Sequence, residues 1–194
     1  MKITRNQFLK LIPAAALTLT GCGSKVQPAN TESLVFSHHY KLDYAQQFTA
    51  DCYEGGYTML TIAESDARFL VVPEDAAEVD GLPADVTVLR QPVENIYLVS
   101  TSVMDLLLHL DALDSVAFSG TKAEGWYLPE VQQAMKEGKI AYAGKYSAPD
   151  YEQILAAGCR LAIENTMILH TPEVKEQLEH FGIPVLVERS SYES

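Results

Sequence analysis

The second half of the chain alternates continuous apolar runs with segments whose apolar residues recur at helical spacing. The apolar runs have the length of strands and lie at 95–100, 115–120, 139–144, 159–165 and 183–188. The segments between them predict four helices, within 101–113, 127–140, 148–158 and 171–182. Thr101 or Ser102 is expected to be the N-cap of the first helix. Strands that are apolar on both faces need cover on both faces, so this rhythm predicts a parallel sheet flanked by helices.

The first half has a different pattern, in which apolar and polar residues partly alternate. Residues 44–72 are rich in β-branched and aromatic side chains and are interrupted by Gly55-Gly56 and by the turn-forming stretch ESDA at 64–67. They predict two or three antiparallel strands, followed by an acidic surface loop at 74–86. The predicted fold class is therefore α/β: a single Rossmann-like unit with a parallel sheet flanked by helices, preceded by an antiparallel β-meander.

The N-terminal residues have the pattern of an export signal. Lys2, Arg5 and Lys10 precede the run LIPAAALTLT, which is shorter than the about 20 residues that a membrane-spanning helix needs. The sequence LTGC at 19–22 then resembles the bacterial lipoprotein signal, in which the enzyme that cuts before the cysteine requires small residues ahead of it. We expect a signal peptide over 1–21 and a lipidated Cys22. The alternative is a buried cysteine in an N-terminal helix.

The segment after Cys22 predicts a tether. Residues 22–43 are mostly polar, contain a proline and show no periodicity, so we expect a lipidated flexible tether there, with a first strand near 34–36, and a folded unit over 44–194. The expected location is outside the cell, anchored by lipid to the outer face of the bacterial cell membrane. Cys52 and Cys159 have no redox or metal spacing and are interpreted as small buried hydrophobes, although an exported compartment would permit a disulfide between them.

Charge excludes one class of partner. The chain has 14 basic and 26 acidic side chains, a formal net charge of −12. Cleavage before Cys22 removes three basic residues and no acidic one, which leaves 11 basic against 26 acidic side chains, or −15. Such a surface repels phosphate backbones, and no basic stripe with interleaved aromatic residues is present in the sequence. Nucleic-acid binding is therefore not expected.

The sequence contains none of the common catalytic signatures. There is no G-x-S-x-G elbow, no P-loop, no G-x-G-x-x-G after a strand and no H-E-x-x-H. His38 and His39 are adjacent, so in an extended segment they point to opposite sides and cannot chelate one metal ion together. The other histidines lie on or beside predicted helices. We therefore expect no enzymatic activity, no cofactor and no metal site made by protein side chains.

The informative polar and aromatic residues follow the predicted strands. In open parallel sheets, ligands bind outside the carboxyl ends of the strands, so these positions have priority as binding residues. Each residue alone also fits a capping or loop role, but together they suit a bulky ligand with apolar and polar parts. The candidate ligand-binding residues are Thr101, Ser102, Trp126, Tyr127, Lys145, Tyr146, Glu164, Asn165, Arg189 and Tyr192.

Three stretches carry a resemblance to a known family: residues 44–62, 143–167 (AGKYSAPDYEQILAAGCRLAIENTM) and 181–194 (FGIPVLVERSSYES). They resemble the N-terminal lobe of the substrate-binding lipoproteins of bacterial ABC importers for iron-siderophore, haem or cobalamin. The resemblance covers about 44–194. It implies a periplasmic-binding-protein architecture of two α/β lobes joined by one rigid helix, with the ligand held between the lobes and delivered to a permease and its ATPase.

The resemblance also implies features that this sequence lacks or matches only loosely. In the family, a second lobe follows a segment like ERSSYES, whereas these 194 residues contain one lobe. We expect an incomplete gene product, a split protein with a separately encoded second lobe, or a remnant domain. Lobe-surface carboxylates that dock on the permease fall near Glu173. The alternative for Glu173 is a glutamate favoured by the dipole at a helix N-terminus.

Two other functional hypotheses remain open from the sequence. Similar paired α/β lobes occur in metal-chelate enzymes, so a chelatase-like or reductase-like activity is one alternative, with Glu164 as its only candidate carboxylate. The other alternative is a lipoprotein that mediates protein interaction alone, through the sheet edge or the tether. Binding of a small ligand separates the leading hypothesis from this last one.

Overall fold

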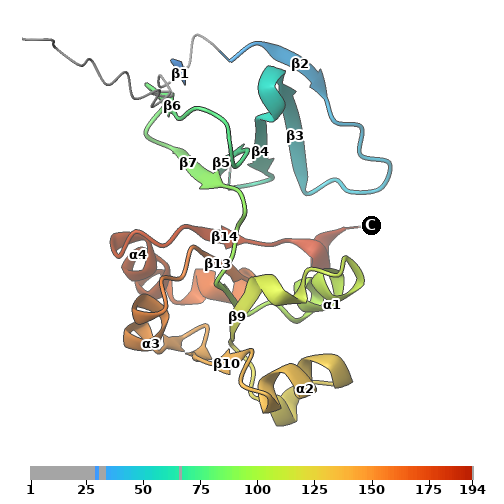
Figure 1. The fold of residues 1–194 in the computed structure, drawn as a ribbon, viewed down its shortest axis with the longest axis vertical. Coiled ribbons are helices and arrows are strands. Elements are labelled where there is room, and N and C mark those ends of the chain that lie inside the picture. The colour runs from blue at the N-terminus through green and yellow to red at the C-terminus, as the bar shows by residue number, and fades with distance from the viewer. Residues whose placement is uncertain (1–28, 31–33, 66, 194) are drawn as a thin grey trace, which may run out of the picture.

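The computed structural model describes residues 29–30, 34–65 and 67–193. Two five-stranded sheets, one antiparallel in its first strands and one parallel, make up most of this part of the chain (Figure 1). Cys22, the predicted signal peptide over 1–21 and the start of the predicted tether lie outside the described residues. None of the helices within the described ranges is both long and apolar enough to cross a membrane.

The first sheet has the order β2-β3-β4-β5-β7. Its strands are β2 (Phe36–His39), β3 (Phe48–Tyr53), β4 (Thr58–Ile62), β5 (Arg68–Val72) and β7 (Val86–Arg90). Neighbours are antiparallel except β5 and β7, which are parallel. The antiparallel strands predicted within 44–72 are confirmed as β3, β4 and β5. We call this first sheet the meander sheet.

The meander sheet also includes two edge strands outside residues 44–72. The strand β2 lies within the segment expected to be a tether, starts where the strand near 34–36 was expected to end, and pairs with β3. The strand β7 follows the acidic loop and closes the other edge of the sheet against β5. Within the loop itself, β6 (Val79–Asp80) pairs in parallel with β1 (Ala29–Asn30). The loop therefore contains a short strand in place of a wholly irregular path.

The second sheet is parallel, as predicted, and has the order β10-β9-β8-β13-β14. Its strands are β8 (Ile96–Leu98), β9 (Val116–Ser119), β10 (Ala141–Tyr142), β13 (Leu161–Glu164) and β14 (Val185–Val187). The predicted helices are present as α1 (Thr101–His109), α2 (Pro129–Lys136), α3 (Tyr151–Ala156) and α4 (Pro172–His180). A short hairpin of β11 (Gly144–Lys145) and β12 (Ala148–Pro149) precedes α3.

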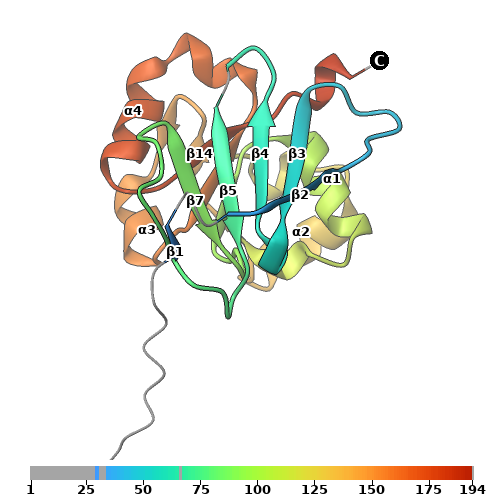
Figure 2. The ribbon, with the colours of Figure 1, turned by 90° about the horizontal axis from the view of Figure 1, so that it is seen from above.

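Two apolar cores lie on the two faces of the parallel sheet. Met104 of α1 and Val131 of α2 belong to one core, which also takes in Phe69 from the meander sheet. Ile154 of α3 and Leu178 of α4 belong to the other core, on the opposite face. Figure 1 shows these helix pairs on opposite sides of the sheet, and Figure 2 shows the meander sheet stacked over the β14 edge. Burial on both faces explains why these strands read as continuous apolar runs.

The strand order reverses at β8, which bears on the carboxyl ends of the parallel strands. The chain runs from β8 outward to β9 and β10, and then returns to place β13 and β14 on the other side of β8. The connections that leave β8 and β13 therefore diverge, and in parallel sheets ligands bind in the gap that this reversal opens. This gap is the place where the sequence predicted the binding residues.

The cap of α1 differs from the prediction. Ser100, and neither Thr101 nor Ser102, is the N-cap: its backbone is extended, and its hydroxyl accepts from the Val103 N–H at 3.5 Å. Thr101 is the first helical residue and Ser102 follows it. The apolar run thus ends at Val99, one residue earlier than predicted, because Ser100 already belongs to the cap.

Candidate functional site

The predicted ligand-binding residues all follow the carboxyl ends of parallel strands, but they differ widely in exposure. Tyr127 is 98% exposed and Tyr192 is 53% exposed, whereas Trp126 is 4% exposed and Glu164 is completely buried. Thr101, Ser102 and Lys145 are exposed. The structure therefore divides the set into side chains that face solvent at this edge and side chains that support the edge from within.

A cluster of hydroxyl groups joins the ends of β8 and β14 across β13. Ser100 Oγ donates to Glu188 Oε1 at 2.8 Å, and Ser102 Oγ lies 3.0 Å from Ser100 Oγ and 2.7 Å from Ser190 Oγ. The Ser190 N–H donates to Glu188 Oε2 at 2.6 Å. We call these four residues the serine cluster. Glu188 was not among the predicted residues, although it holds the last position of the fifth apolar run.

The hydrogen-bond directions in the serine cluster decide what it can bind. Because a serine has one hydroxyl proton and that of Ser100 goes to Glu188, Ser102 must donate to Ser100, and Ser190 to Ser102. All three hydroxyl protons are then used within the cluster, while lone pairs on its oxygens remain. The cluster therefore accepts hydrogen bonds from a ligand that carries N–H or O–H groups.

The start of α1 lies beside this cluster. The first turn of α1 contains no acidic residue, and Thr101 and Ser102 in that turn are exposed. A helix N-terminus carries a partial positive charge and unpaired N–H groups, so it favours an acceptor or an anionic group. Together, α1 and the serine cluster can meet both donors and acceptors of a polar ligand.

Trp126 and Tyr146 support this edge from within. The Trp126 indole N–H donates to Ser119 Oγ at 3.1 Å and to the Thr121 carbonyl at 3.2 Å, so its polar atom is satisfied inside the protein. Tyr146 packs against the core on the α3–α4 face. These two aromatic side chains anchor the loops after β9 and β10, while the neighbouring Tyr127 leaves its ring in solvent.

Arg189 connects the end of β14 to the meander sheet. Its Nε donates to Gln47 Oε1 at 2.9 Å, and its Nη2 lies 2.7 Å from Glu64 Oε2. Its guanidinium lies 4.4 Å from the centroid of the Tyr192 ring. Only 9% of the Arg189 side chain is exposed. Its charge is therefore engaged between the two sheets, and Tyr192 is the member of the pair that presents surface to a ligand.

We expect Arg189→Ala to destabilise the fold by about 1–3 kcal/mol, because it removes a nearly buried charged donor from Gln47 and Glu64. The urea midpoint of purified protein, at an unchanged m-value, measures the loss. The matched control is Lys41→Ala, which breaks only the exposed ion pair between Lys41 and Asp43 and is expected to cost less than about 0.5 kcal/mol. Equal midpoints for the two variants would show that Arg189 does not hold the two sheets together.

Glu164 is the most unusual member of the predicted set. It ends β13, is completely buried, and neither of its carboxyl oxygens has a hydrogen-bond partner in the described part of the chain. Burial raises the pKa of its carboxyl group to about 8, so the group is mostly protonated at neutral pH. The next residue, Asn165, turns its side chain to the backbone instead: Asn165 Oδ1 accepts from the Met167 N–H at 2.9 Å.

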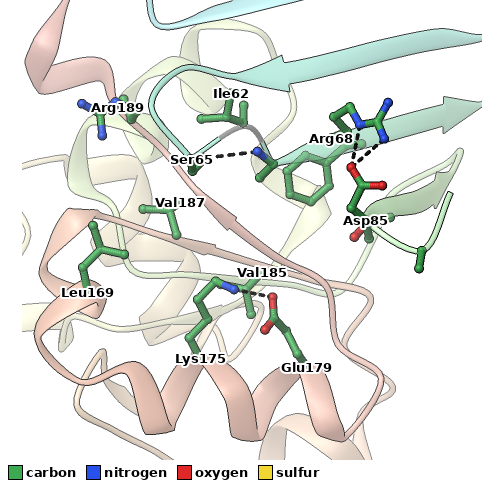
Figure 3. A pocket seen from close by; sticks show the side chains of 14 residues that line it. Ile62, Ser65, Arg68, Asp85, Leu169, Lys175, Glu179, Val185, Val187 and Arg189 are labelled. Atoms are coloured by element: carbon green, nitrogen blue, oxygen red, sulfur yellow. Dashed lines mark hydrogen bonds and ion pairs between the residues drawn. The ribbon is translucent and has the colours of Figure 1, made fainter.

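A pocket of about 360 Å³ adjoins this edge, between the meander sheet and α4. Figure 3 shows Val185 and Val187 on its floor and Leu169 and Arg189 at the end nearest the carboxyl edge. Its other charged lining residues form ion pairs: Arg68 with Asp85 and Lys175 with Glu179, each at 2.6 Å. With those charges already paired, the pocket is a weaker candidate for a charged ligand than the exposed side chains at the strand ends.

A second hollow of about 370 Å³ lies on the other side of β14 and is almost wholly apolar. Phe48 and Leu60 of the meander sheet, Leu106 of α1 and Leu186 of β14 line it. Glu193 lies at its rim and accepts from the backbone N–H groups of Gln46 at 2.6 Å and Gln47 at 3.0 Å. The two hollows show that the meander sheet covers the β14 edge incompletely.

The side chains at the edge are hydroxyl groups, a carboxylate and aromatic rings. In the serine cluster, the Ser100 hydroxyl donates to the Glu188 carboxylate, and the cluster contains no histidine. Within residues 29–30, 34–65 and 67–193, no three His, Cys, Asp or Glu side chains come together as a metal site. Cys52 and Cys159 are both free thiols. The edge offers hydrogen bonds and aromatic surface to a ligand.

Comparisons with known proteins add no assignment. No model of a protein family matches the sequence, and no curated protein matches it.

Proposed function

We propose that residues 44–194 are one lobe of a substrate-binding lipoprotein that serves an ABC importer for an iron complex, haem or cobalamin. The lobe captures its ligand outside the cell and delivers it to the permease. The observation that carries the proposal is the polar and aromatic edge where the strand order reverses, with the serine cluster at its centre. The resemblance of three sequence stretches to that family supports it.

The exposed groups at this edge suit a large ligand with mixed chemistry. Tyr127 and Tyr192 present aromatic rings, and Lys145 presents a positive charge. The serine cluster accepts hydrogen bonds from N–H and O–H groups, which amide-bearing chelates and cobalamin carry in number. A small bare ion would need a compact set of like ligands instead.

In the proposed arrangement, this edge is one wall of a ligand cleft, and a second lobe supplies the other wall. A ligand held against one wall keeps about half of its contacts, so the isolated lobe is expected to bind several kcal/mol more weakly than a two-lobed receptor. Glu173, exposed in the first turn of α4, is the proposed contact to a positively charged permease surface.

Isothermal calorimetry on the purified lobe tests the proposed function. Haemin, a ferric hydroxamate siderophore and cyanocobalamin are titrated separately into about 100 μM protein, so that dissociation constants up to about 1 mM are detected. We expect saturable binding of one of these three classes. No saturable heat with any of them would reject the importer proposal and favour a lipoprotein that only mediates protein interaction.

Attachment through Cys22 is a separate part of the proposal, with its own test. We expect Cys22→Ser to abolish incorporation of radiolabelled palmitate in a bacterial host and to release the protein from the membrane fraction. A multiply acylated cysteine is a lasting anchor, and without it nothing in the proposal holds the protein to the lipid surface. Cys52→Ser is the matched control, because Cys52 lies on β3 inside the folded unit. Equal labelling of Cys22→Ser and wild-type protein would refute lipidation.

A further inference from the structure

The buried carboxyl group of Glu164 lies on one particular face of the parallel sheet. Along β13, Leu161 and Ile163 belong to the core on the α1–α2 face, and Ala162 belongs to the core on the α3–α4 face. Because side chains alternate along a strand, Glu164 points to the α3–α4 face with Ala162. An unpaired polar group in such a place is costly, and an unpaired charge costs far more.

In the part of the chain that the structure describes, no basic group balances the buried carboxyl of Glu164. Tyr97 of β8 and Tyr151 of α3 are the titratable side chains that interact with it, and its charge adds to the burial that raises the pKa of both phenols. The Tyr97 hydroxyl is already used, since it donates to the Gly144 carbonyl at 2.9 Å. The other elements packed on this face contribute apolar side chains, among them Val174 of α4 and Val187 of β14. No basic group contributes to the raised pKa of Glu164, whose cause is burial.

The turn that follows Glu164 is held mainly by one side chain. Ile168 is completely buried in the same core, whereas its neighbours Met167 and Leu169 are 46% and 57% exposed. The remaining bonds are local: the Ile168 N–H donates to the Asn165 carbonyl at 3.2 Å, and the Thr171 N–H to the Ile168 carbonyl at 2.9 Å. These hydrogen bonds lie within the turn, so its closure depends on the packing of Ile168, and a segment held in this way opens more easily than a core strand.

We propose that Glu164 is a proton-controlled latch for residues 165–171. When it is protonated, it stays packed against the α3–α4 core and the turn stays closed. To lose its proton it must reach water, and the turn directly after it is the nearest cover that can move aside. Rising pH between about 5 and 8 thus favours the open turn, because the open form ionises at an ordinary glutamate pKa and the closed form does not.

The latch would act on the candidate site. The turn carries Leu169, which lines the pocket of Figure 3, and it begins at Asn165 on the carboxyl edge. Opening would therefore change the surface that meets the ligand. This consequence for ligand binding rests on the proposed function, whereas the latch itself does not.

Native-state hydrogen exchange on the wild-type and Glu164→Gln proteins, without ligand, tests the latch. In wild-type protein, we expect protection of the Ile168 and Thr171 amides to fall by up to about tenfold per pH unit between about pH 5 and 8, after correction for the intrinsic rate. Low urea should leave this exchange unchanged, because a local opening exposes little surface. The Leu98 amide in the core should respond to urea. In Glu164→Gln the pH dependence at Ile168 should disappear.

Several results would overturn the latch. The latch is wrong if carbon-13 NMR of the glutamate side chains places the Glu164 titration below about pH 6. It is also wrong if urea accelerates amide exchange at Ile168 as strongly as at Leu98, since the turn would then open only by global unfolding. If Glu164→Gln does not fold, the titration and the exchange of the wild-type protein decide the question. Neither measurement uses a ligand, so failure of the latch and failure of the importer proposal are distinguishable.

Discussion

The Glu164→Gln protein is expected to lose most of the pH dependence that wild-type stability shows between about pH 5 and 8. Burial raises the pKa of Glu164 to about 8 in the folded protein, against an ordinary glutamate pKa of about 4.5. Between these values the unfolded chain releases its proton while the folded chain keeps it. The free energy of unfolding of the wild type should therefore fall by up to about 1.4 kcal/mol per pH unit as pH rises, or about 3–4 kcal/mol over the range.

The sign of this effect follows from proton linkage. Below about pH 4.5 Glu164 is neutral in both states, so no free energy is spent on holding a buried charge. Above about pH 8 it is ionised in both states, and the folded protein bears the full cost of the buried charge. Urea unfolding at several pH values gives the slope for wild type, Glu164→Gln and Glu152→Gln. Glu152 is an exposed glutamate on α3 and should keep the wild-type slope. A Glu164→Gln protein with the wild-type slope would contradict an ionisation cost at Glu164.

Trp126→Ala is expected to destabilise the protein by about 3–5 kcal/mol, because it empties a large buried site. The Trp126 side chain is 4% exposed and packs in the core on the α1–α2 face. Its indole N–H satisfies Ser119 Oγ and the Thr121 carbonyl, so the substitution also removes two hydrogen bonds. Urea denaturation monitored by circular dichroism measures the loss without relying on the only tryptophan in the chain.

The neighbouring residue provides the matched control for Trp126. Tyr127 is 98% exposed, and Tyr127→Ala should change the free energy of unfolding by less than about 0.5 kcal/mol. A small loss of unfolding free energy for Trp126→Ala would mean that the indole is not packed as described. Trp126 would then again be a candidate for the exposed ligand-binding surface. A large loss for Tyr127→Ala would show that Tyr127 has packing contacts that its exposure hides.

The parallel sheet was predictable because its signal is local. Each strand forms a short apolar run, and punctuation near the helix ends, such as Pro129 at the start of α2 and Gly182 just after α4, bounds the helices. Burial on both faces of the sheet produced those runs, so the pattern and the structure share one cause. The position of the candidate edge followed from the same runs, because the carboxyl ends of parallel strands meet on one side.

The features that were not predictable depend on contacts between distant segments. The strands β2 and β7 are edge strands, and pairing with β3 and β5 defines them more than their own composition does. Arg189 donates a hydrogen bond to Gln47, which lies 142 residues earlier in the chain, and no local sequence pattern predicts such a contact. The opposite exposures of Trp126 and Tyr127 arise in the same way. Two adjacent aromatic residues are equivalent in a local sequence pattern, and only the packing of the core determines which of them is buried.

Ligand capture at the carboxyl edge of the parallel sheet is the central claim, and one calorimetric comparison tests it most directly. Haemin, a ferric hydroxamate siderophore and cyanocobalamin are titrated into wild type, Tyr127→Ala and Phe181→Ala. Phe181 is 40% exposed and follows α4 shortly before β14, at the amino end of the parallel sheet. We predict that Tyr127→Ala weakens the binding seen in wild type by about tenfold, whereas Phe181→Ala leaves it unchanged. Equal affinity in all three proteins, or a loss only in Phe181→Ala, would contradict the account.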